Sequence, residues 1–153
     1  EVSFAIIIAA VTRSVVIGII SSVVFFLIVE MPIKNLFYIF YATFFGSFFI
    51  GSLGFVTGLW ATKFDHTATI TNFIIQPLSF LSGVFYTIDR LPLFFQKVSS
   101  VNPFFHIINI FRYGFLGVSD GPLLFGLIYL PVLALLGWFI AFFLYKKGYK
   151  IKS

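Results

Sequence analysis

Four long apolar runs, separated by short polar connections, constrain this chain more than any other feature of its sequence. The runs cover residues 14–29, 35–60, 69–88 and 122–145. A helix needs roughly 20 apolar residues to cross the hydrocarbon core of a bilayer. The first run reaches that length with residues taken from before Arg13, whose long side chain then extends to the interface. The pattern predicts an all-α, polytopic membrane helical bundle with four transmembrane helices.

The composition rules out a water-soluble fold. Of 153 residues, 60% are hydrophobic and only 10% are charged, whereas a soluble domain carries about 25% charged residues. A domain of this size leaves much of its surface exposed, so it has no core large enough for 24 Phe and 7 Tyr. The absence of cysteine excludes disulfides and thiolate metal sites. The apolar surface must therefore face lipid.

The distribution of basic residues predicts the orientation of the chain. The formal net charge is +5, and Lys and Arg lie at the ends of the apolar runs. Cytoplasmic segments of membrane proteins are enriched in these residues. Four crossings put both ends on one side, which carries six basic residues against four on the other. We expect a multi-pass protein of the plasma (inner) membrane with both ends in the cytoplasm, in contact with the lipid bilayer and without a nucleic-acid partner.

The connection at residues 89–121 is too apolar for a solvated loop. Phe94, Val98 and Val101 follow an i, i+4, i+7 pattern, which is typical of an amphipathic helix. Asn102 and Pro103 then read as an N-cap and the first residue of a second helix. Neither helix is long enough to cross a bilayer. The segment is therefore predicted to form a re-entrant helical hairpin at the outer side, a geometry tolerated only where protein or a water-filled cavity covers it.

The second helix of this hairpin carries a stripe of polar side chains. The stripe consists of His106, Asn109, Arg112 and Tyr113, with Phe and Ile around the rest of the helix. Polar groups at membrane depth face protein or water rather than lipid. We interpret these four residues as candidates for an outer gate.

The third apolar run contains another polar stripe. Asn72, Gln76, Ser79 and Gly83 recur at helical spacing, and Pro77 is expected to bend the helix. Two interpretations stay open: hydrogen bonds between helices of the bundle, or the wall of a translocation path. We name these four residues as path candidates.

A stripe of small residues marks the second run. Ser47, Gly51, Gly54 and Gly58 share one helix face, and small residues at this spacing let transmembrane helices approach closely. We expect these four positions to pack against a neighbouring helix.

The sequence offers no catalytic or metal-binding motif. It lacks the phosphate-binding G-x-x-x-x-G-K-[ST] loop and the H-E-x-x-H zinc motif. We expect no catalytic residue, no metal and no cofactor in this chain, which cannot itself hydrolyse ATP.

Local motifs over residues 76–117 suggest a family. Pro77 precedes an F-L-S-G-x-F-Y stretch at 80–86, followed by L-P at 91–92, N-P at 102–103 and R-Y-G at 112–114. The order and spacing of these motifs resemble ABC-transporter permeases of the type-2 export class. Within that class, this region resembles polysaccharide and multidrug exporter permeases.

The resemblance implies a fold and a mechanism. It implies that residues 1–153 form one permease domain corresponding to the last four spans of a six-helix permease, with 1–13 at the end of a cytoplasmic coupling region. The chain begins at Glu1 without Met, and we expect that an N-terminal portion precedes it. The family pairs two permease subunits, here expected as a homodimer, with separate cytoplasmic ABC ATPase subunits that bind ATP and Mg²⁺. The cargo implied is a polysaccharide, a lipid-linked glycan or a drug-like amphiphile.

Two alternatives belong to other functional classes. One is an ATP-independent pore or carrier, and the other is a membrane scaffold subunit that does not transport. Ion-coupled carriers need carboxylates within the membrane, whereas Glu30, Asp65, Asp89 and Asp120 fall at the ends of the apolar runs.

Overall fold

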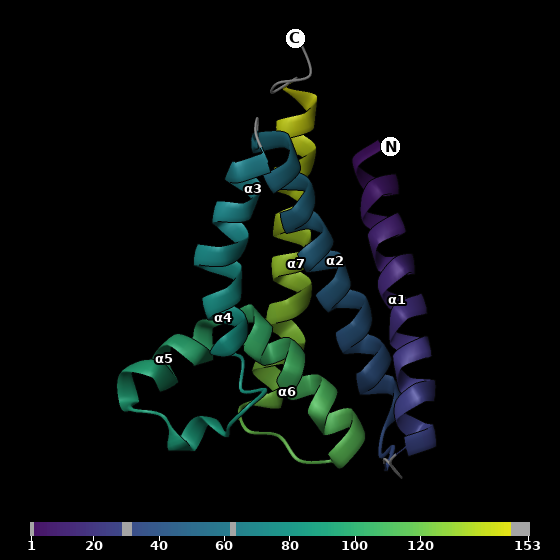
Figure 1. The fold of residues 1–153 in the computed structure, drawn as a ribbon, viewed down its shortest axis with the longest axis vertical. Helices are drawn as coiled ribbons and strands as arrows, with labels where there is room; N and C mark the ends of the chain where they lie inside the picture. The colour runs from purple at the N-terminus through teal and green to yellow at the C-terminus, as the bar shows by residue number, and fades with distance from the viewer. Residues whose placement is uncertain (1, 29–31, 62–63, 148–153) are drawn as a thin grey trace.

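The computed structural model describes residues 2–28, 32–61 and 64–147, and this part of the chain is helical without any β-strand. Three helices form a bundle: α1 (Val2–Ile28), α2 (Leu36–Trp60) and α7 (Leu123–Lys146) (Figure 1). Each is long and apolar enough to cross a membrane, over Phe4–Ile28, Leu36–Trp60 and Leu123–Lys146. The first turn of α1 and the last turn of α7 lie at the same end of the bundle. The prediction of an all-helical membrane bundle is confirmed.

Helix α1 runs unbroken through Arg13, the predicted boundary of the first span. Residues 2–13, expected at the end of a cytoplasmic coupling region, form the first half of this helix. The segment contains neither Gly nor Pro before Gly18, so nothing in its backbone chemistry interrupts the helical hydrogen bonds. Arg13 lies on the exposed surface of α1.

The third predicted run forms a shorter helix than expected. It is built from α3 (Phe64–Ile70), a π-helical turn η1 (Thr71–Ile75) and α4 (Gln76–Phe80). These 17 helical residues extend about 25 Å at 1.5 Å per residue, and helical structure ends at Phe80 rather than near residue 88. The wide turn lies directly before Pro77, whose missing N–H removes one α-helical hydrogen bond.

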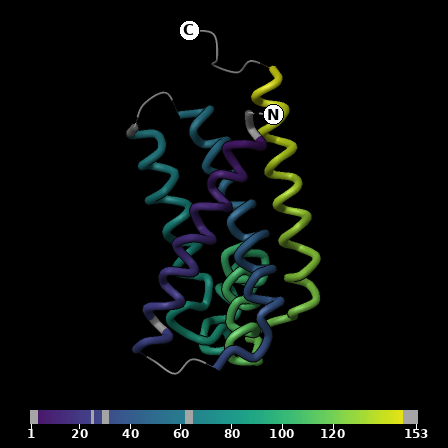
Figure 2. Tube along the Cα trace, turned by 90° about the vertical axis from the view of Figure 1, so that its right-hand side faces the viewer, coloured from purple at the N-terminus to yellow at the C-terminus, as the bar shows by residue number. Residues whose placement is uncertain are grey.

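The hairpin packs against the bundle through its second helix. It comprises a 3₁₀ turn η2 (Ile88–Arg90), α5 (Leu93–Val101) and α6 (Pro103–Leu116), and it lies at the end of the bundle opposite the first turn of α1 (Figure 2). The Asn102 side chain accepts a hydrogen bond from the Phe104 N–H at 3.0 Å, with Pro103 at the first helical position. Gly117 ends α6 with a φ of 71°. The predicted start of this helix is confirmed.

The core lies where α2, α6 and α7 meet. Ala42, Ile110 and Leu130 are fully buried there. The closest approach is at Gly114 of α6, where a Cβ atom would stand 2.5 Å from Ile39 Cγ1 of α2. The absence of a side chain at this position thus allows α6 to lie directly on α2.

A proline within α7 explains a hydrogen bond between helices. Pro131 has no N–H, so the Leu127 carbonyl four residues earlier has no α-helical donor. The Tyr41 hydroxyl of α2 donates to this carbonyl at 2.5 Å. The neighbouring helix therefore supplies the donor that α7 lacks.

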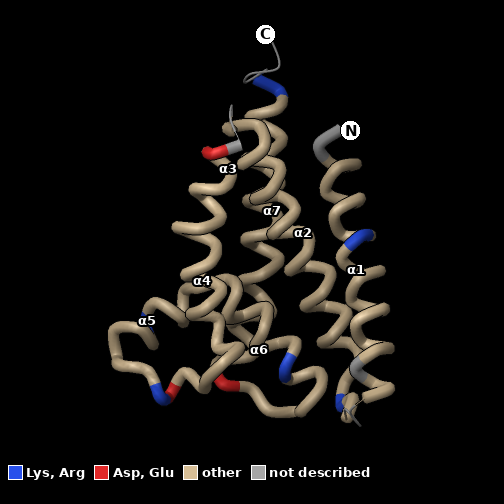
Figure 3. Tube along the Cα trace, viewed as in Figure 1, with Lys and Arg blue, Asp and Glu red and all other residues tan. Residues whose placement is uncertain are grey.

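Apart from Arg13 within α1, charged residues lie towards the two ends of the bundle, and the middles of α2 and α7 carry none (Figure 3). Such a distribution suits a bundle whose middle lies in hydrocarbon.

Candidate functional site

The four path candidates extend from an open helix face into the protein. Asn72 and Gln76 are exposed, Ser79 is half-buried and Gly83 is buried. The helix at 64–80 carries the first three of them, and Gly83 lies in the chain that follows it. This helix is in contact with the rest of the described bundle at its two ends, through α3 against α2 and α4 against α6. Its middle is open, since Phe73 is 77% exposed. The structure thus places the two amides on a free face and the last two residues beside the hairpin.

The gate candidate Arg112 joins three segments at the hairpin. Its guanidinium forms an ion pair with Asp120 in the loop before α7 and donates a hydrogen bond to the Gly83 carbonyl. Gly83 has a φ of 78°, a conformation that a residue with a side chain rarely adopts. Arg112 therefore connects α6 both to the chain following α4 and to the chain preceding α7.

Asn109 holds the same loop. Its side-chain oxygen accepts a hydrogen bond from the Asp120 N–H at 2.8 Å, and its amide nitrogen donates to the Gly121 carbonyl at 3.3 Å. The side chain is 1% exposed, so both of its polar atoms are satisfied by the loop without water. Together with Arg112, it fixes the path of the chain into α7.

His106 and Tyr113 lie on the same helix but in different surroundings. The fully buried His106 ring donates from Nε2 to the Ser100 carbonyl at 2.8 Å, which places the ring proton on Nε2. Its Nδ1 has no partner within the described residues and faces Gly126, where a Cβ atom would stand at 3.2 Å. Tyr113 instead packs edge-on against Tyr38 of α2, with ring centroids 4.9 Å apart. Asn109 and Arg112 therefore share the loop before α7, whereas His106 and Tyr113 each contact other neighbours.

Helix α5 presents its apolar face outwards. Phe94 is 70% exposed and Val101 is 65% exposed. The polar Ser99, in contrast, is fully buried and donates to the Leu81 carbonyl at 3.0 Å. A helix in water buries its apolar face, so this reversed arrangement indicates that the outer face of α5 meets an apolar environment.

Sequence reasoning missed three side chains that hold the hairpin. Ser99 was not singled out, Asp120 was noted only as a carboxylate at the end of an apolar run, and Asn102 was recognised only as an N-cap. The Asn102 amide nitrogen also donates to the Leu78 carbonyl at 2.6 Å. Their partners lie 8 to 24 residues away, and no local spacing pattern reports such pairs. The one available signal was the presence of small polar residues within an otherwise apolar segment.

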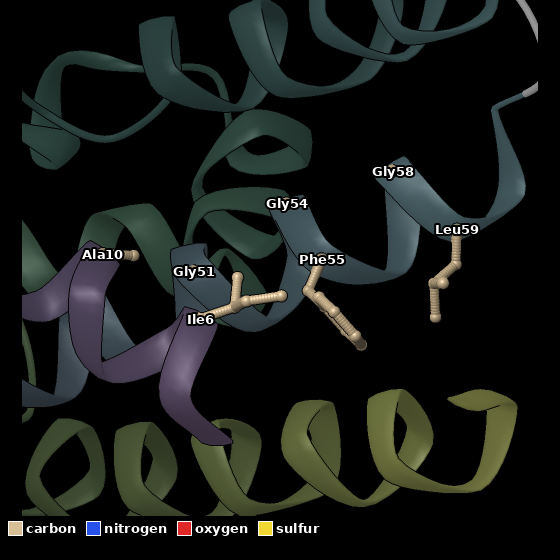
Figure 4. A pocket seen from close by; sticks show the side chains of 7 residues that line it. All are labelled: Ile6, Ala10, Gly51, Gly54, Phe55, Gly58 and Leu59. Carbon is tan, nitrogen blue, oxygen red and sulfur yellow. The ribbon is translucent and has the colours of Figure 1, made fainter. Parts of the chain in front are cut away.

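The small residues of α2 line an open groove beside α1. Gly51, Gly54 and Gly58 contribute to a hollow of about 400 Å³ that also involves Ile6 and Ala10 of α1 (Figure 4). A Cβ atom at Gly51 would stand 3.1 Å from Ala10 Cβ, whereas Gly54 and Gly58 have no neighbour within 4 Å of such an atom. Ser47, the fourth packing candidate, is half-buried.

The arrangement of these sites suits a change of conformation rather than a chemical reaction. Within residues 2–28, 32–61 and 64–147, no three His, Cys, Asp or Glu side chains are grouped so that they could hold a metal ion. The polar groups around the hairpin bond mainly to backbone carbonyls and amides. The arrangement can hold or release segments of the chain relative to one another.

The fold and the polar hairpin define a polytopic helical membrane protein. Residues 1–116 match the family model described as ABC-2 type transporter, and the chain belongs to that family. The resemblance to this transporter class inferred from residues 76–117 is thereby confirmed.

Curated relatives share part of the chain. It is 37% identical over 102 residues to the inner membrane transport permease YadH of Escherichia coli K12. The aligned region covers 65% of this chain and 39% of that protein. It is 35% identical over 66 residues to nodulation protein J of Rhizobium leguminosarum bv. viciae, covering 43% of this chain and 26% of the relative. The chain thus spans about two fifths of the first of these relatives. No solved structure matches it significantly.

Proposed function

We propose that this chain is the membrane-spanning part of an ATP-driven exporter, powered by a separate cytoplasmic ABC ATPase subunit that binds ATP and Mg²⁺. The observation that carries the proposal is membership of residues 1–116 in the ABC-2 type transporter family. Residues 1–153 contain no phosphate-binding loop, and the proposal assigns hydrolysis to a partner subunit.

The helix at 64–80 forms a fourth crossing and one wall of the translocation path. Asn72 and Gln76 are exposed on its open face. Amide side chains in a bilayer face protein or water, because lipid offers them no hydrogen-bond partner. A second copy of the permease, facing this surface, closes the path between the two subunits.

The hairpin acts as the outer gate of this path. Its apolar α5 surface, with Phe94 and Val101 exposed, is directed towards the acyl chains of the outer leaflet. Its polar α6 surface is held by Asn109 and Arg112 within the protein. A re-entrant segment with polar groups inside and apolar groups outside satisfies the requirement that irregular backbone at membrane depth be covered by protein.

The orientation places both ends of the chain in the cytoplasm of an inner-membrane protein. The first turn of α1 and the last turn of α7 share one end of the bundle, where Lys146 and Lys147 lie. The positive-inside rule assigns such an end to the cytoplasm. The relative named as an inner membrane transport permease supports the same location.

An amphiphilic cargo fits this architecture. We include polysaccharides, lipid-linked glycans and drug-like amphiphiles, since the path wall joins amide groups to aromatic surface. The alternatives are an ATP-independent pore or carrier and a scaffold subunit. The described parts of α1, α2 and α7 contain no Asp or Glu, which disfavours an ion-coupled carrier.

Purification of the full-length parent protein tests the proposal. We expect an ATPase subunit with a phosphate-binding loop to copurify in mild detergent, and we expect its ATPase activity to rise when the complex is reconstituted in liposomes. Crosslinking should also give a permease dimer. A homogeneous membrane protein without any ATPase, even when expressed with its neighbouring genes, would refute the exporter and favour the pore.

A further inference from the structure

The helix at 64–80, formed by α3, η1 and α4, is called the third helix from here on. Its outer end leaves several backbone carbonyls without helical donors. A helix ends with up to four such carbonyls, which need partners from elsewhere. Here side chains of the hairpin donate hydrogen bonds to three carbonyls at and just beyond this end: one in the last helical turn, one at the C-cap and one in the chain that follows. The pairs are the Asn102 amide with Leu78 at 2.6 Å, the Ser99 hydroxyl with Leu81 at 3.0 Å and the Arg112 guanidinium with Gly83. We call these three donors and three carbonyls the carbonyl clamp.

Because two of its donors are buried, the hydrogen bonds of the clamp are hard to break one at a time. Ser99 is fully buried and Asn102 is 2% exposed, so water does not replace either donor when its bond breaks. A buried carbonyl left without a donor is strongly destabilising, more so at membrane depth. The end of the third helix and the hairpin therefore separate only if both bonds are exchanged for others.

Asn102 links the clamp to the start of α6. Its side-chain oxygen accepts the Phe104 N–H and caps the helix, while its nitrogen reaches the Leu78 carbonyl. One side chain thus fixes the first turn of α6 and the last turn of α4 together. Any rotation of α6 is transmitted to the third helix through this residue.

The clamp contrasts with the loose attachment of the rest of the third helix. The helix contacts α2 through α3 at one end and α6 through α4 at the other. Its surface between these contacts is open, and Ile74 there is 54% exposed. A helix held at its ends pivots there and not along its length. The outer end is held by hydrogen bonds to the hairpin rather than by hydrophobic packing against α7.

We propose that Ser99, Asn102 and Arg112 are positioning residues that make the third helix and the hairpin one moving unit in the transport cycle. The inference rests on the proposed exporter function for its motion, but the clamp itself is testable without it. When the path wall moves, the gate moves with it, so that opening of the path and opening of the outer end occur in one step.

The test uses spin labels, because the chain contains no cysteine and labelling sites are free to choose. In the full-length protein, with any cysteine outside this chain replaced, pairs of labels are placed at exposed positions. The first pair joins Phe73 to Phe94 across the clamp, and the second joins Phe73 to Ile128 on α7. Labelled subunits are diluted with unlabelled ones so that only distances within a chain are measured.

The variant that opens the clamp is Ser99→Ala with Asn102→Ser. Serine is a good N-cap, so α6 keeps its start while the donor to Leu78 is lost. The matched control is Ser100→Ala, because the Ser100 hydroxyl donates within its own helix to the Lys97 carbonyl at 2.8 Å.

We expect the Phe73–Phe94 distance distribution to be narrow in the parent and the control and to broaden or split in the double variant. Between nucleotide-free and ATP-trapped complexes of the parent, we expect the Phe73–Ile128 distance to change while Phe73–Phe94 does not. Transport per ATP hydrolysed should fall by about tenfold in the double variant with basal ATPase activity kept.

Three results would overturn the clamp: an unchanged distribution in the double variant, an equal change of both distances in the parent, or no change of either. Failure of the exporter function is a separate outcome, recognised by the absence of an ATPase partner. In that case the comparison between the double variant and Ser100→Ala, made without nucleotide, still decides whether the clamp holds the two segments together.

Discussion

The hydrogen bond from Tyr41 to the Leu127 carbonyl offers a sharp test of how this bundle accommodates a proline in a membrane helix. Because Pro131 has no N–H, α7 contains no donor for this carbonyl, and the Tyr41 hydroxyl lies 2.5 Å from it. Tyr41→Phe keeps the ring and removes the donor. Pro131→Ala restores an N–H within α7, which makes the tyrosine hydroxyl unnecessary.

The magnitude follows from two ranges. Leaving a buried acceptor without a donor costs about 1–3 kcal/mol, while hydrogen bonds between membrane helices average about 0.6 kcal/mol and reach about 1.7 kcal/mol. The Leu127 carbonyl belongs at the upper end, since its own helix cannot satisfy it. We expect Tyr41→Phe to lower the free energy of unfolding by about 1–2 kcal/mol. In the Pro131→Ala background, we expect a loss below about 0.5 kcal/mol.

A double-mutant cycle measures this coupling. The parent protein, both single variants and the double variant are unfolded in mixed micelles of rising denaturing-detergent content, followed by tryptophan fluorescence. Tyr38→Phe is the matched control, because the Tyr38 hydroxyl makes no hydrogen bond to a described residue while its ring packs on Tyr113. An equal loss from Tyr41→Phe in both backgrounds would show that the hydroxyl does not substitute for the missing N–H.

Three further predictions concern packing, transport and topology. Gly114→Ala should lower the unfolding free energy by about 1–3 kcal/mol, since the new methyl group collides with Ile39. Gly18→Ala, with no neighbour within 4 Å of the new methyl group, should not lower it. The same micelle titration compares the two variants, and equal effects would contradict the close approach. Gln76→Leu should leave assembly on gel filtration intact and reduce export from reconstituted vesicles if the third helix lines the path; unchanged export would return this residue to a packing role. A reporter enzyme fused after Ser153 should be active in the cytoplasm, and periplasmic activity would reverse the topology.

The sequence predicted well those helices whose position is set by the length of an apolar run or by a capping residue. Runs of apolar residues indicated α2 and α7, and Asn102 with Pro103 indicated the start of α6. These signals are local, since helix length and capping depend on residues adjacent in the chain. The family motifs at 76–117 similarly identified the transporter class before any geometry was known.

Other features could not be read from local patterns. The i, i+4, i+7 spacing at Phe94 predicted the helix α5 but not that its apolar side faces outwards, because periodicity is the same in water and in lipid. The early end of the third helix at Phe80 depends on carbonyl partners such as Ser99, which lies 18 residues from Leu81. The bond between Tyr41 and Leu127 joins residues 86 positions apart. Such pairs become known only from the three-dimensional arrangement of the helices.

The partners of α6 have a consequence for the order in which this protein is assembled during synthesis. Asn109 and Arg112 bond to Asp120 and Gly121, which the ribosome adds after α6 is complete. Until those residues emerge, the polar side of α6 has no loop to receive it, so we expect the hairpin to settle only as α7 enters the membrane. A cysteine in place of the fully buried Ile110 should react with a water-soluble thiol reagent in nascent chains that stop before α7 and be protected in chains that include it. Protection already present in the shorter chains would show that the hairpin settles on its own.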